Sequence, residues 1–249
     1  MKLLENPIVA ILAAVVIFLL GAAMGGMYTK IQVLEGKAAG TTNALAAGTA
    51  APAGNNQTPS APTAPPSPTK VDPKVTADDP YQGNANAKLT VVEFGDYQCP
   101  FCGRFFSDTE PQLKKDYIDT GKIKFVFKNL AFLGKESIDA ANAALCAKEQ
   151  NKFWEYHDKI YSNQKGENQG AFSIDNLKKF AADLGLNTTQ FNGCLDAQKY
   201  SAQVQADVAE ANRLGFNSTP STAVGDTPVI GAQPYASFKT IIDQKLSAL

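Results

Sequence analysis

The chain has 249 residues, of which 44% are hydrophobic and 19% are charged, a composition typical of a folded protein and not of a disordered one. Its formal net charge is -1, which excludes the basic excess that a nucleic-acid-binding domain carries, so no nucleic-acid partner is expected. The chain has one histidine, His157, which argues against a Ser-His-Asp hydrolase and against a metal site built from several histidines.

The chain begins with an apolar segment. Residues 8–27 carry no charged side chain, and as a helix they would rise about 30 Å, enough to cross the hydrocarbon core of a bilayer. We therefore expect residues 1–30 to form an N-terminal transmembrane helix that anchors the protein in the cell membrane as a single-pass protein. The alternative is a signal peptide that is cleaved after the small residues 21–23, which would leave a secreted or periplasmic protein. In both cases the remainder of the chain lies on the extracytoplasmic side.

A segment of low complexity follows the apolar run. Residues 38–69 contain no charged side chain and consist largely of Ala, Thr, Gly, Asn, Ser and Pro. This composition buries too little apolar surface to offset the entropy of ordering. We expect residues 31–73 to form a disordered linker between the anchor and a folded domain.

Residues 74–249 have the pattern of an α/β domain. Residues 89–94 and 123–128 are β-branched, apolar runs next to glycines, which predicts two buried strands. Residues 101–117 between them suit a helix that buries Phe105, Phe106 and Leu113. A strand, a helix and a strand at this spacing predict a βαβ unit with parallel strands.

A mainly helical region is expected at about residues 131–215. Apolar residues follow the helical period in four stretches, and Ser173 is positioned to cap the third of them; the stretches are 138–148, 153–161, 174–184 and 200–214. Gly225 and Asp226 then predict a turn within a short hairpin, and residues 235–249 predict a closing helix.

Two residues separate Cys99 from Cys102, and the pair lies where the first predicted strand ends and the helix begins. At the start of a helix, free backbone N–H groups and the helix dipole favour a thiolate on Cys99, whereas Cys102 lies one turn further and is expected to be more buried. This spacing and context predict a redox-active pair in which Cys99 exchanges disulfides and Cys102 resolves them. Half of a zinc site and a purely structural disulfide are the alternatives.

The sequence around this pair resembles the active-site segment of the DsbA-like thiol–disulfide oxidoreductases, in particular their membrane-tethered bacterial forms. The resemblance is carried by residues 92–102 (VEFGDYQCPFC), 152–157 (KFWEYH) and 231–235 (GAQPY), and it extends over most of residues 88–249. It implies a thioredoxin fold with a helical subdomain inserted between the βαβ unit and the closing hairpin and helix. It implies no bound cofactor and no metal.

The resemblance also assigns roles to further residues. Thr219 and Pro220 match a cis-proline loop that faces the cysteine pair, although the residues themselves also allow an ordinary trans turn. Glu93 matches a buried acidic residue that accepts or relays the proton of Cys102, with a paired, structural glutamate as the alternative.

The remaining polar residues near the motif are expected to be structural. Asp96 suits a turn, and His157 suits a packed position in a helix. The chain departs from the family after the proline, where residues 221–223 are small and polar and Pro228 interrupts the next strand, which leaves the length of that strand and the shape of the substrate groove open.

Cys146 and Cys194 are left over in an exported domain, and such cysteines commonly pair. Similar pairs join the helical insert in some relatives of the family. A structural disulfide is therefore expected, with a second redox relay as the alternative.

Taken together, these residues predict an extracytoplasmic protein thiol–disulfide oxidoreductase that introduces disulfides into exported, cysteine-containing proteins through Cys99 and Cys102. A quinone-linked membrane partner is expected to reoxidise it, as in the family. A reductase or isomerase of the same fold is one alternative. The other is a non-catalytic, tethered binding or chaperone module whose cysteines only staple the site.

Overall fold

The computed structural model describes residues 68–249. The expected transmembrane helix (residues 1–30) and residues 31–67 of the expected linker lie outside this range. The last residues of the expected linker pack on the domain instead: Val71 is buried, and its backbone N–H donates a hydrogen bond of 3.0 Å to the Asp226 carbonyl. Within residues 68–249, no helix is both long enough and apolar enough to span a membrane.

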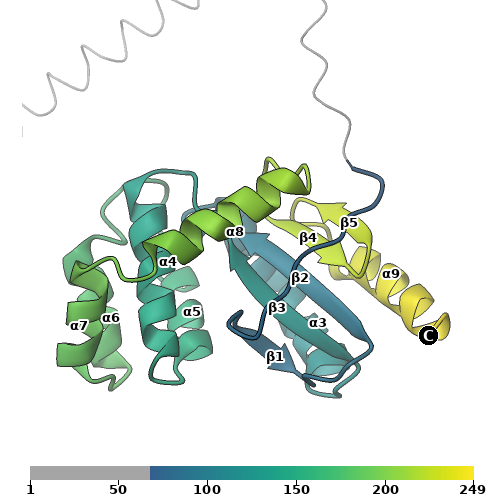
Figure 1. Ribbon diagram of the computed structural model, residues 1–249, viewed down its shortest axis with the longest axis horizontal. Helices are drawn as coiled ribbons and strands as arrows, with labels where there is room; N and C mark the ends of the chain where they lie inside the picture. Colours follow the sequence, from purple (N-terminus) through teal and green to yellow (C-terminus); the bar gives the residue numbers. More distant parts are fainter. Residues whose placement is uncertain (1–67) are drawn as a thin grey trace, which may run out of the picture. The chain divides into compact units, whose positions relative to one another are not determined.

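The centre of the domain is a five-stranded sheet with the order β1-β3-β2-β4-β5 (Figure 1). The strands are β1 (Tyr81–Gly83), β2 (Leu89–Gly95), β3 (Ile123–Asn129), β4 (Ser221–Val224) and β5 (Thr227–Ile230). Strands β2 and β3 are parallel, and the other three neighbouring pairs are antiparallel. The two parallel strands are buried along nearly their whole length, as expected for strands that are covered on both faces.

One continuous helical stretch connects β2 to β3, which confirms the predicted βαβ unit. It consists of α2 (Pro100–Arg104), the π-helical turn η1 (Phe105–Thr109), α3 (Glu110–Leu113) and the π-helical turn η2 (Lys114–Ile118). Each π-helical turn widens the helix by one residue and so shifts which side chains face the sheet. As a result both Thr109 and Glu110 are buried.

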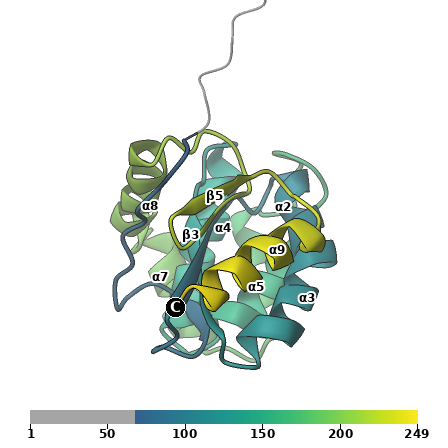
Figure 2. The ribbon, with the colours of Figure 1, turned by 90° about the vertical axis from the view of Figure 1, so that its right-hand side faces the viewer.

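Helices cover both faces of the sheet (Figure 2). On one face, Phe105 and Leu113 pack with Val91 and Phe125, together with Phe238 of the closing helix α9 (Tyr235–Ser247). On the other face, α8 (Ser201–Arg213) and the residues that follow it cover the sheet; the cluster there is formed by Val92, Phe94, Val126, Ala211, Leu214 and Phe216. Because successive strand residues point to opposite faces, Glu93 lies on the same face as Val91, under the α2–η2 stretch.

The helical insert contains α4 (Lys135–Lys148), α5 (Phe153–Tyr161), α6 (Ile174–Asp183) and α7 (Thr188–Asp196) besides α8. Helix α7 was not predicted from the sequence. Ser173 precedes α6 as predicted, but its side chain makes no capping hydrogen bond, so that part of the prediction was wrong. Cys146 of α4 and Cys194 of α7 form a disulfide that joins the two helices.

A buried ion pair ties the insert to the sheet. Lys128 Nζ at the end of β3 lies 2.7 Å from Asp79 Oδ1 and 3.1 Å from Asp207 Oδ1 of α8, and all three side chains are almost fully buried. Asp207 Oδ2 also accepts a hydrogen bond from the Asn129 backbone N–H at 3.1 Å. Asp207 therefore fixes α8 against the carboxyl end of β3.

The hairpin and helix that close the domain occur where the sequence predicts them. Gly225 has a φ of 59°, which the tight turn between β4 and β5 requires. Pro228 lies opposite Ala223 in β5, the edge strand of the sheet, a position where the missing N–H of proline is tolerated. The predicted α/β fold with a helical insertion is thus confirmed.

Candidate active site

Cys99 and Cys102 lie at the start of the helical stretch that follows β2. Cys99 is the N-cap residue of α2, Pro100 occupies the first turn, and Cys102 follows inside the helix. Both cysteines are thiols, and Cys102 is completely buried whereas Cys99 is 5% exposed. The two sulfurs therefore differ in accessibility in the order that the sequence predicts.

The loop that contains Thr219 and Pro220 faces Cys99. The peptide bond between these two residues is cis, and Cys99 Sγ lies 3.4 Å from the Thr219 carbonyl oxygen. Ser221 Oγ donates a hydrogen bond of 2.6 Å to the Ser218 carbonyl, which closes the loop on itself. Backbone atoms of this loop are thus held beside the sulfur.

The surroundings of Cys99 favour its thiolate. A hydrogen bond from the Cys102 thiol is the largest influence, and it lowers the pKa of Cys99 to about 6. The Thr219 side chain and the backbone N–H groups of Phe101 and Cys102 act in the same direction, whereas partial burial opposes them. The sequence predicts that the helix N-terminus lowers the pKa of Cys99. In the structure, the neighbouring Cys102 thiol lowers this pKa more strongly.

The surroundings of Cys102 favour its protonated thiol. Burial raises the pKa of its thiol well above the ordinary value, and the negative charges of Cys99 and Glu93 add to this effect. The Asp96 backbone N–H points at Cys102 Sγ at 3.5 Å and opposes the rise slightly. The pair thus combines a less deeply buried sulfur that ionises readily with a fully buried sulfur that keeps its proton.

Glu93 lies in the middle of β2 and is 1% exposed. Within residues 68–249, its Oε2 atom has no hydrogen-bond partner. Burial raises the pKa of Glu93 well above the ordinary value, and the charges of Glu110 and Cys99 raise it further. The structure therefore places a protonatable carboxyl group near both sulfurs, without the basic partner that a purely structural glutamate would have.

Asp96 and His157 have structural surroundings. Asp96 accepts hydrogen bonds from the backbone N–H groups of Gln98, Phe132 and Leu133 and from the Ser137 hydroxyl, so it holds the loop before Cys99 in place. His157 is fully buried among aromatic rings, as expected for a packed residue.

Two residues near the site were not identified from the sequence. Gln164, just after α5, donates hydrogen bonds to the carbonyl oxygens of Tyr97 at 2.6 Å and Cys99 at 3.2 Å, and so links the insert to the active-site loop. Nothing in the sequence signals this long-range contact. Glu110 is the second; it lies eight residues after Cys102 along the helical stretch, a spacing that puts it near the same face and could have marked it.

The entrance to the site carries exposed aromatic side chains. Phe101 is 54% exposed and Phe132, whose backbone bonds to Asp96, is 49% exposed. The guanidinium carbon of Arg104 lies 5.0 Å above the Phe101 ring. Large apolar groups that remain exposed beside a reactive sulfur are suited to contact an unfolded polypeptide.

Comparisons with known proteins agree with this geometry. The family model for thioredoxin matches residues 75–244. Disulfide bond formation protein D of Bacillus subtilis is 33% identical over 172 residues, which cover 67% of this chain and 77% of that protein. A putative protein-disulfide oxidoreductase of Rickettsia prowazekii is 32% identical over 160 residues, covering 61% of this chain and 56% of that protein.

Solved structures lead to the same family. BdbD from Bacillus subtilis, in its oxidised form, aligns with a TM-score of 0.68 and 30% identity over 73% of this chain and 100% of that one. The thiol–disulfide exchange protein α-DsbA2 from Wolbachia pipientis aligns with a TM-score of 0.60 and 28% identity over 68% of this chain and 88% of that one. The chain belongs to the thioredoxin family and is a DsbA-like thiol–disulfide oxidoreductase.

Proposed function

We propose that this protein introduces disulfide bonds into exported, cysteine-containing proteins, with Cys99 as the sulfur that exchanges with the client and Cys102 as the resolving sulfur. The observation that carries the proposal is the difference between the two thiols. The hydrogen bond from Cys102 lowers the pKa of Cys99 to about 6, whereas burial raises the pKa of Cys102 well above its ordinary value.

This difference gives each sulfur its step. A client thiolate attacks Cys99 Sγ of the oxidised pair, the Cys99–Cys102 bond breaks, and its electron pair leaves on Cys102, which takes up a proton from Glu93. The second client cysteine then attacks the client sulfur of the mixed disulfide, and Cys99 leaves as a thiolate. A thiol of low pKa is a good leaving group and stabilises the reduced protein, so the pair favours oxidation of clients over reduction or isomerisation.

Features around Cys99 suit an extended client peptide. The Thr219 carbonyl lies beside the sulfur and offers a backbone acceptor, which is the kind of contact that β-strand addition uses. Phe101 and Phe132 add exposed apolar surface at the same entrance. None of these contacts depends on a particular client side chain, in keeping with an enzyme that acts on many proteins.

The proposal includes a place for the reaction. The apolar residues 8–27 would anchor the protein as a single-pass membrane protein, or direct its export before cleavage, and residues 31–73 would hold the catalytic domain away from the bilayer on the extracytoplasmic side. After each cycle the reduced pair needs an oxidant, and a quinone-linked membrane protein would supply it. The resemblance to membrane-tethered DsbA-like proteins supports this arrangement.

A trapping experiment tests the proposal. In a full chain with Cys102→Ala, the Cys99 thiolate still attacks the disulfide of an oxidised client, and one client cysteine leaves as a thiolate. No resolving thiol remains, so disulfide-linked complexes that disappear on reduction are expected on a gel. The matched Cys99→Ser variant should form none. Absence of complexes with Cys102→Ala, or function retained by Cys99→Ser, would show that the protein is a tethered binding module.

The direction of the reaction has its own test. The reduction potential of the full chain, measured in glutathione buffers, is expected to be more oxidising than that of glutathione. A potential more reducing than that of glutathione would identify a reductase instead.

A further inference from the structure

Five buried side chains from β2, the loop before Cys99, α3 and α5 each have a buried polar atom without a hydrogen-bond partner in residues 68–249. They are Glu93 (Oε2), Tyr97 (OH), Glu110 (Oε2), His157 (Nε2) and Tyr161 (OH), and we call them the buried polar cluster. Buried polar atoms without partners are rare, because each costs the free energy of desolvation. Five of them in one region indicate a function that a well-paired core would not serve.

Packing connects the inner part of the cluster to β2. Glu93 and Gly95 point to the same face of that strand, and a Cβ atom on Gly95 would lie 2.9 Å from the Tyr161 hydroxyl. The Tyr161 hydroxyl therefore lies over Gly95, on the face of β2 that also carries Glu93 two residues earlier. The Tyr161 ring centroid is 4.9 Å from those of both Tyr97 and His157.

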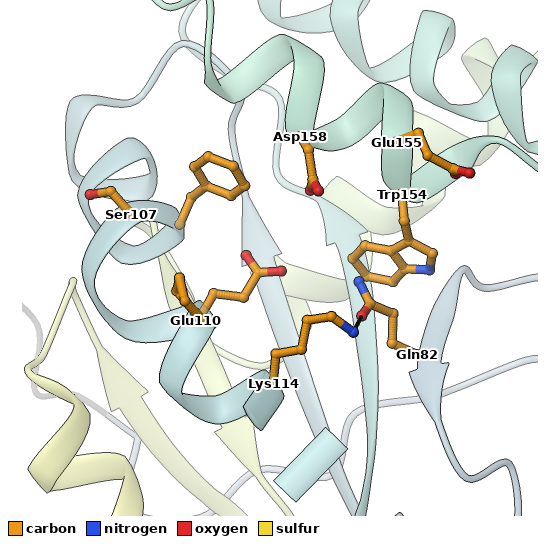
Figure 3. Close-up of a pocket in the computed structure, with 9 residues that line it drawn as sticks. Gln82, Ser107, Glu110, Lys114, Trp154, Glu155 and Asp158 are labelled. Atoms are coloured by element: carbon orange, nitrogen blue, oxygen red, sulfur yellow. Dashed lines mark hydrogen bonds between the residues drawn. The ribbon is translucent and has the colours of Figure 1, made fainter. Parts of the chain in front are cut away.

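The outer part of the cluster reaches a cavity between the α2–η2 stretch and α5. This cavity has a volume of about 700 Å³, and Glu110 lines it although its side chain is almost completely buried. Figure 3 shows the Glu110 carboxyl group pointing into the cavity, toward Asp158 and Trp154. Phe106, which also lines the cavity, packs against Tyr161 with a centroid distance of 5.2 Å, so the cavity adjoins the cluster.

The two carboxyl groups of the cluster influence each other. Negative charge on Glu110 raises the pKa of Glu93, and burial raises the pKa of Glu110 itself to about 7. An ordinary carboxyl group is fully ionised at neutral pH, whereas Glu110 gains and loses its proton there. Two interacting carboxyl groups of this kind share protons instead of ionising independently.

We propose that Glu110 is the outer end of a proton path that connects Cys102, through Glu93, with water in the cavity beside α5. The proposal deepens the proposed function and rests on it. Glu110 touches neither sulfur, so it is a positioning and proton-supplying residue that acts through Glu93.

Disulfide exchange at Cys99 is accompanied by proton transfer to Cys102. A client thiolate bonds to Cys99 Sγ, the Cys99–Cys102 bond breaks, and Cys102 leaves with the electron pair. The proton that Cys102 takes up comes from Glu93, Glu93 receives one from Glu110, and Glu110 receives one from cavity water. The route runs backwards when Cys102 loses its proton during reoxidation.

Kinetics of the full, oxidised chain with reduced glutathione test the proposal, with rates expressed per glutathione thiolate between pH 5 and 9. In the wild type the rate is expected to fall as the pH rises through about 7, because Glu110 then loses the proton that it supplies. The titratable and charged groups that face Glu110 are Glu93 of β2, Lys114 of η2, and Glu155, His157 and Asp158 of α5.

Three variants test whether the inflection belongs to Glu110. Glu110→Gln keeps the size of the side chain but cannot titrate, so the inflection near pH 7 is expected to vanish and the rate at pH 6 to fall roughly tenfold. Glu110→Asp is expected to retain an inflection. Glu155→Gln is the control, because Glu155 lines the same cavity but is exposed and paired with Lys152 at 2.8 Å; its profile should match the wild type.

The results that overturn the proposal are distinct from failure of the proposed function. If Glu110→Gln keeps the inflection and the wild-type rate within twofold, Glu110 supplies no proton. If the wild type exchanges no disulfide with glutathione, the proposed function itself fails.

A measurement on the wild type keeps the proposal testable if Glu110→Gln does not fold. Carboxyl ¹³C NMR should show Glu110 titrating near pH 7, with a different midpoint in the oxidised and reduced proteins. Equal midpoints in the two redox states would contradict the path.

Discussion

The sulfur of Cys99 lies 3.4 Å from the carbonyl oxygen of Thr219, a residue 120 positions later in the chain. The two residues belong to loops that are far apart in the sequence. Cys99 follows β2, and Thr219 precedes β4, which pairs with β2. Pairing of these neighbouring strands brings the two loops together at one end of the sheet. The helical insert between them in the sequence does not disturb this contact.

The ionisation of Cys99 gives the first prediction. Alkylation of the reduced full chain by iodoacetamide should be half-maximal at about pH 6, because the neighbouring thiol lowers the pKa of Cys99 to that value. Cys102→Ala removes the hydrogen bond and should move the midpoint upward. Cys102→Ser keeps a donor and should give a midpoint between the two. A midpoint near that of an unperturbed cysteine in the wild type would contradict this account.

The same shift predicts how pH affects the stability of the reduced protein. The pKa of Cys99 is lower in the folded state, about 6, than in the unfolded state, about 9. Its ionisation therefore stabilises the fold fully above pH 9, and this stabilisation is lost as the pH falls through about 6. Urea unfolding of the reduced chain should therefore show stability from Cys99 that increases from pH 6 to 9. In Cys99→Ser, this part of the pH dependence should be absent.

The disulfide between Cys146 and Cys194 gives a prediction for stability alone. It closes a loop across a sequence separation of 48, and its removal should lower the free energy of unfolding by up to about 4 kcal/mol in the loop-entropy model. A Cys146→Ala, Cys194→Ala double variant, compared by urea unfolding, measures this loss. Its glutathione exchange rate should equal that of the wild type; a lower rate would indicate a second redox role for this pair.

The buried ion pair gives a prediction for the insert. Asp207→Ala should cost about 1–3 kcal/mol, because Lys128 keeps Asp79 as its counter-charge but the buried Asn129 N–H loses its acceptor. Lys179→Gln is a suitable control, since its pair with Asp183 is exposed and should be worth less than about 1 kcal/mol. Equal losses in urea unfolding for the two variants would contradict the assigned role of Asp207.

Gly95 gives a prediction for packing at the active site. An added methyl group would lie 2.8 Å from the Phe127 ring and 2.9 Å from the Tyr161 hydroxyl, so Gly95→Ala should destabilise the protein by about 1–3 kcal/mol. Gly193→Ala is the matched control: Gly193 lies inside α7 with no atom within 4 Å of an added Cβ, and alanine should stabilise that helix by about 0.5–1 kcal/mol. Thermal unfolding of both variants would reveal opposite shifts in Tm.

The elements that the sequence predicts well have a strong local signal. Strands β2 and β3 are rich in β-branched and aromatic residues, and α5 and α6 bury one regular face, so their composition and period suffice. The candidate pair, Cys99 and Cys102, was predicted from its spacing and from its place between a strand and a helix. Burial of Cys102 below Cys99 follows from that place alone.

The elements that were missed depend on distant contacts. Strand β1 has three residues, and only its pairing with β3 makes it a strand. Helix α7 contains threonines and a glycine, which are poor helix formers, and it is held by packing of Phe191 and by the bond from Cys194 to Cys146. The charge interaction between Glu110 and Glu93 was missed because the two residues lie on different elements, α3 and β2, and nothing in the sequence links those positions.

Pro228 in the edge strand β5 has a consequence for assembly. An edge strand with a full set of free N–H and C=O groups can extend its sheet onto another polypeptide, which is a common start of aggregation. Because proline has no N–H, β5 cannot provide an unbroken row of donors to a neighbouring chain. The domain is thereby protected at this edge from joining a neighbouring polypeptide in a shared sheet.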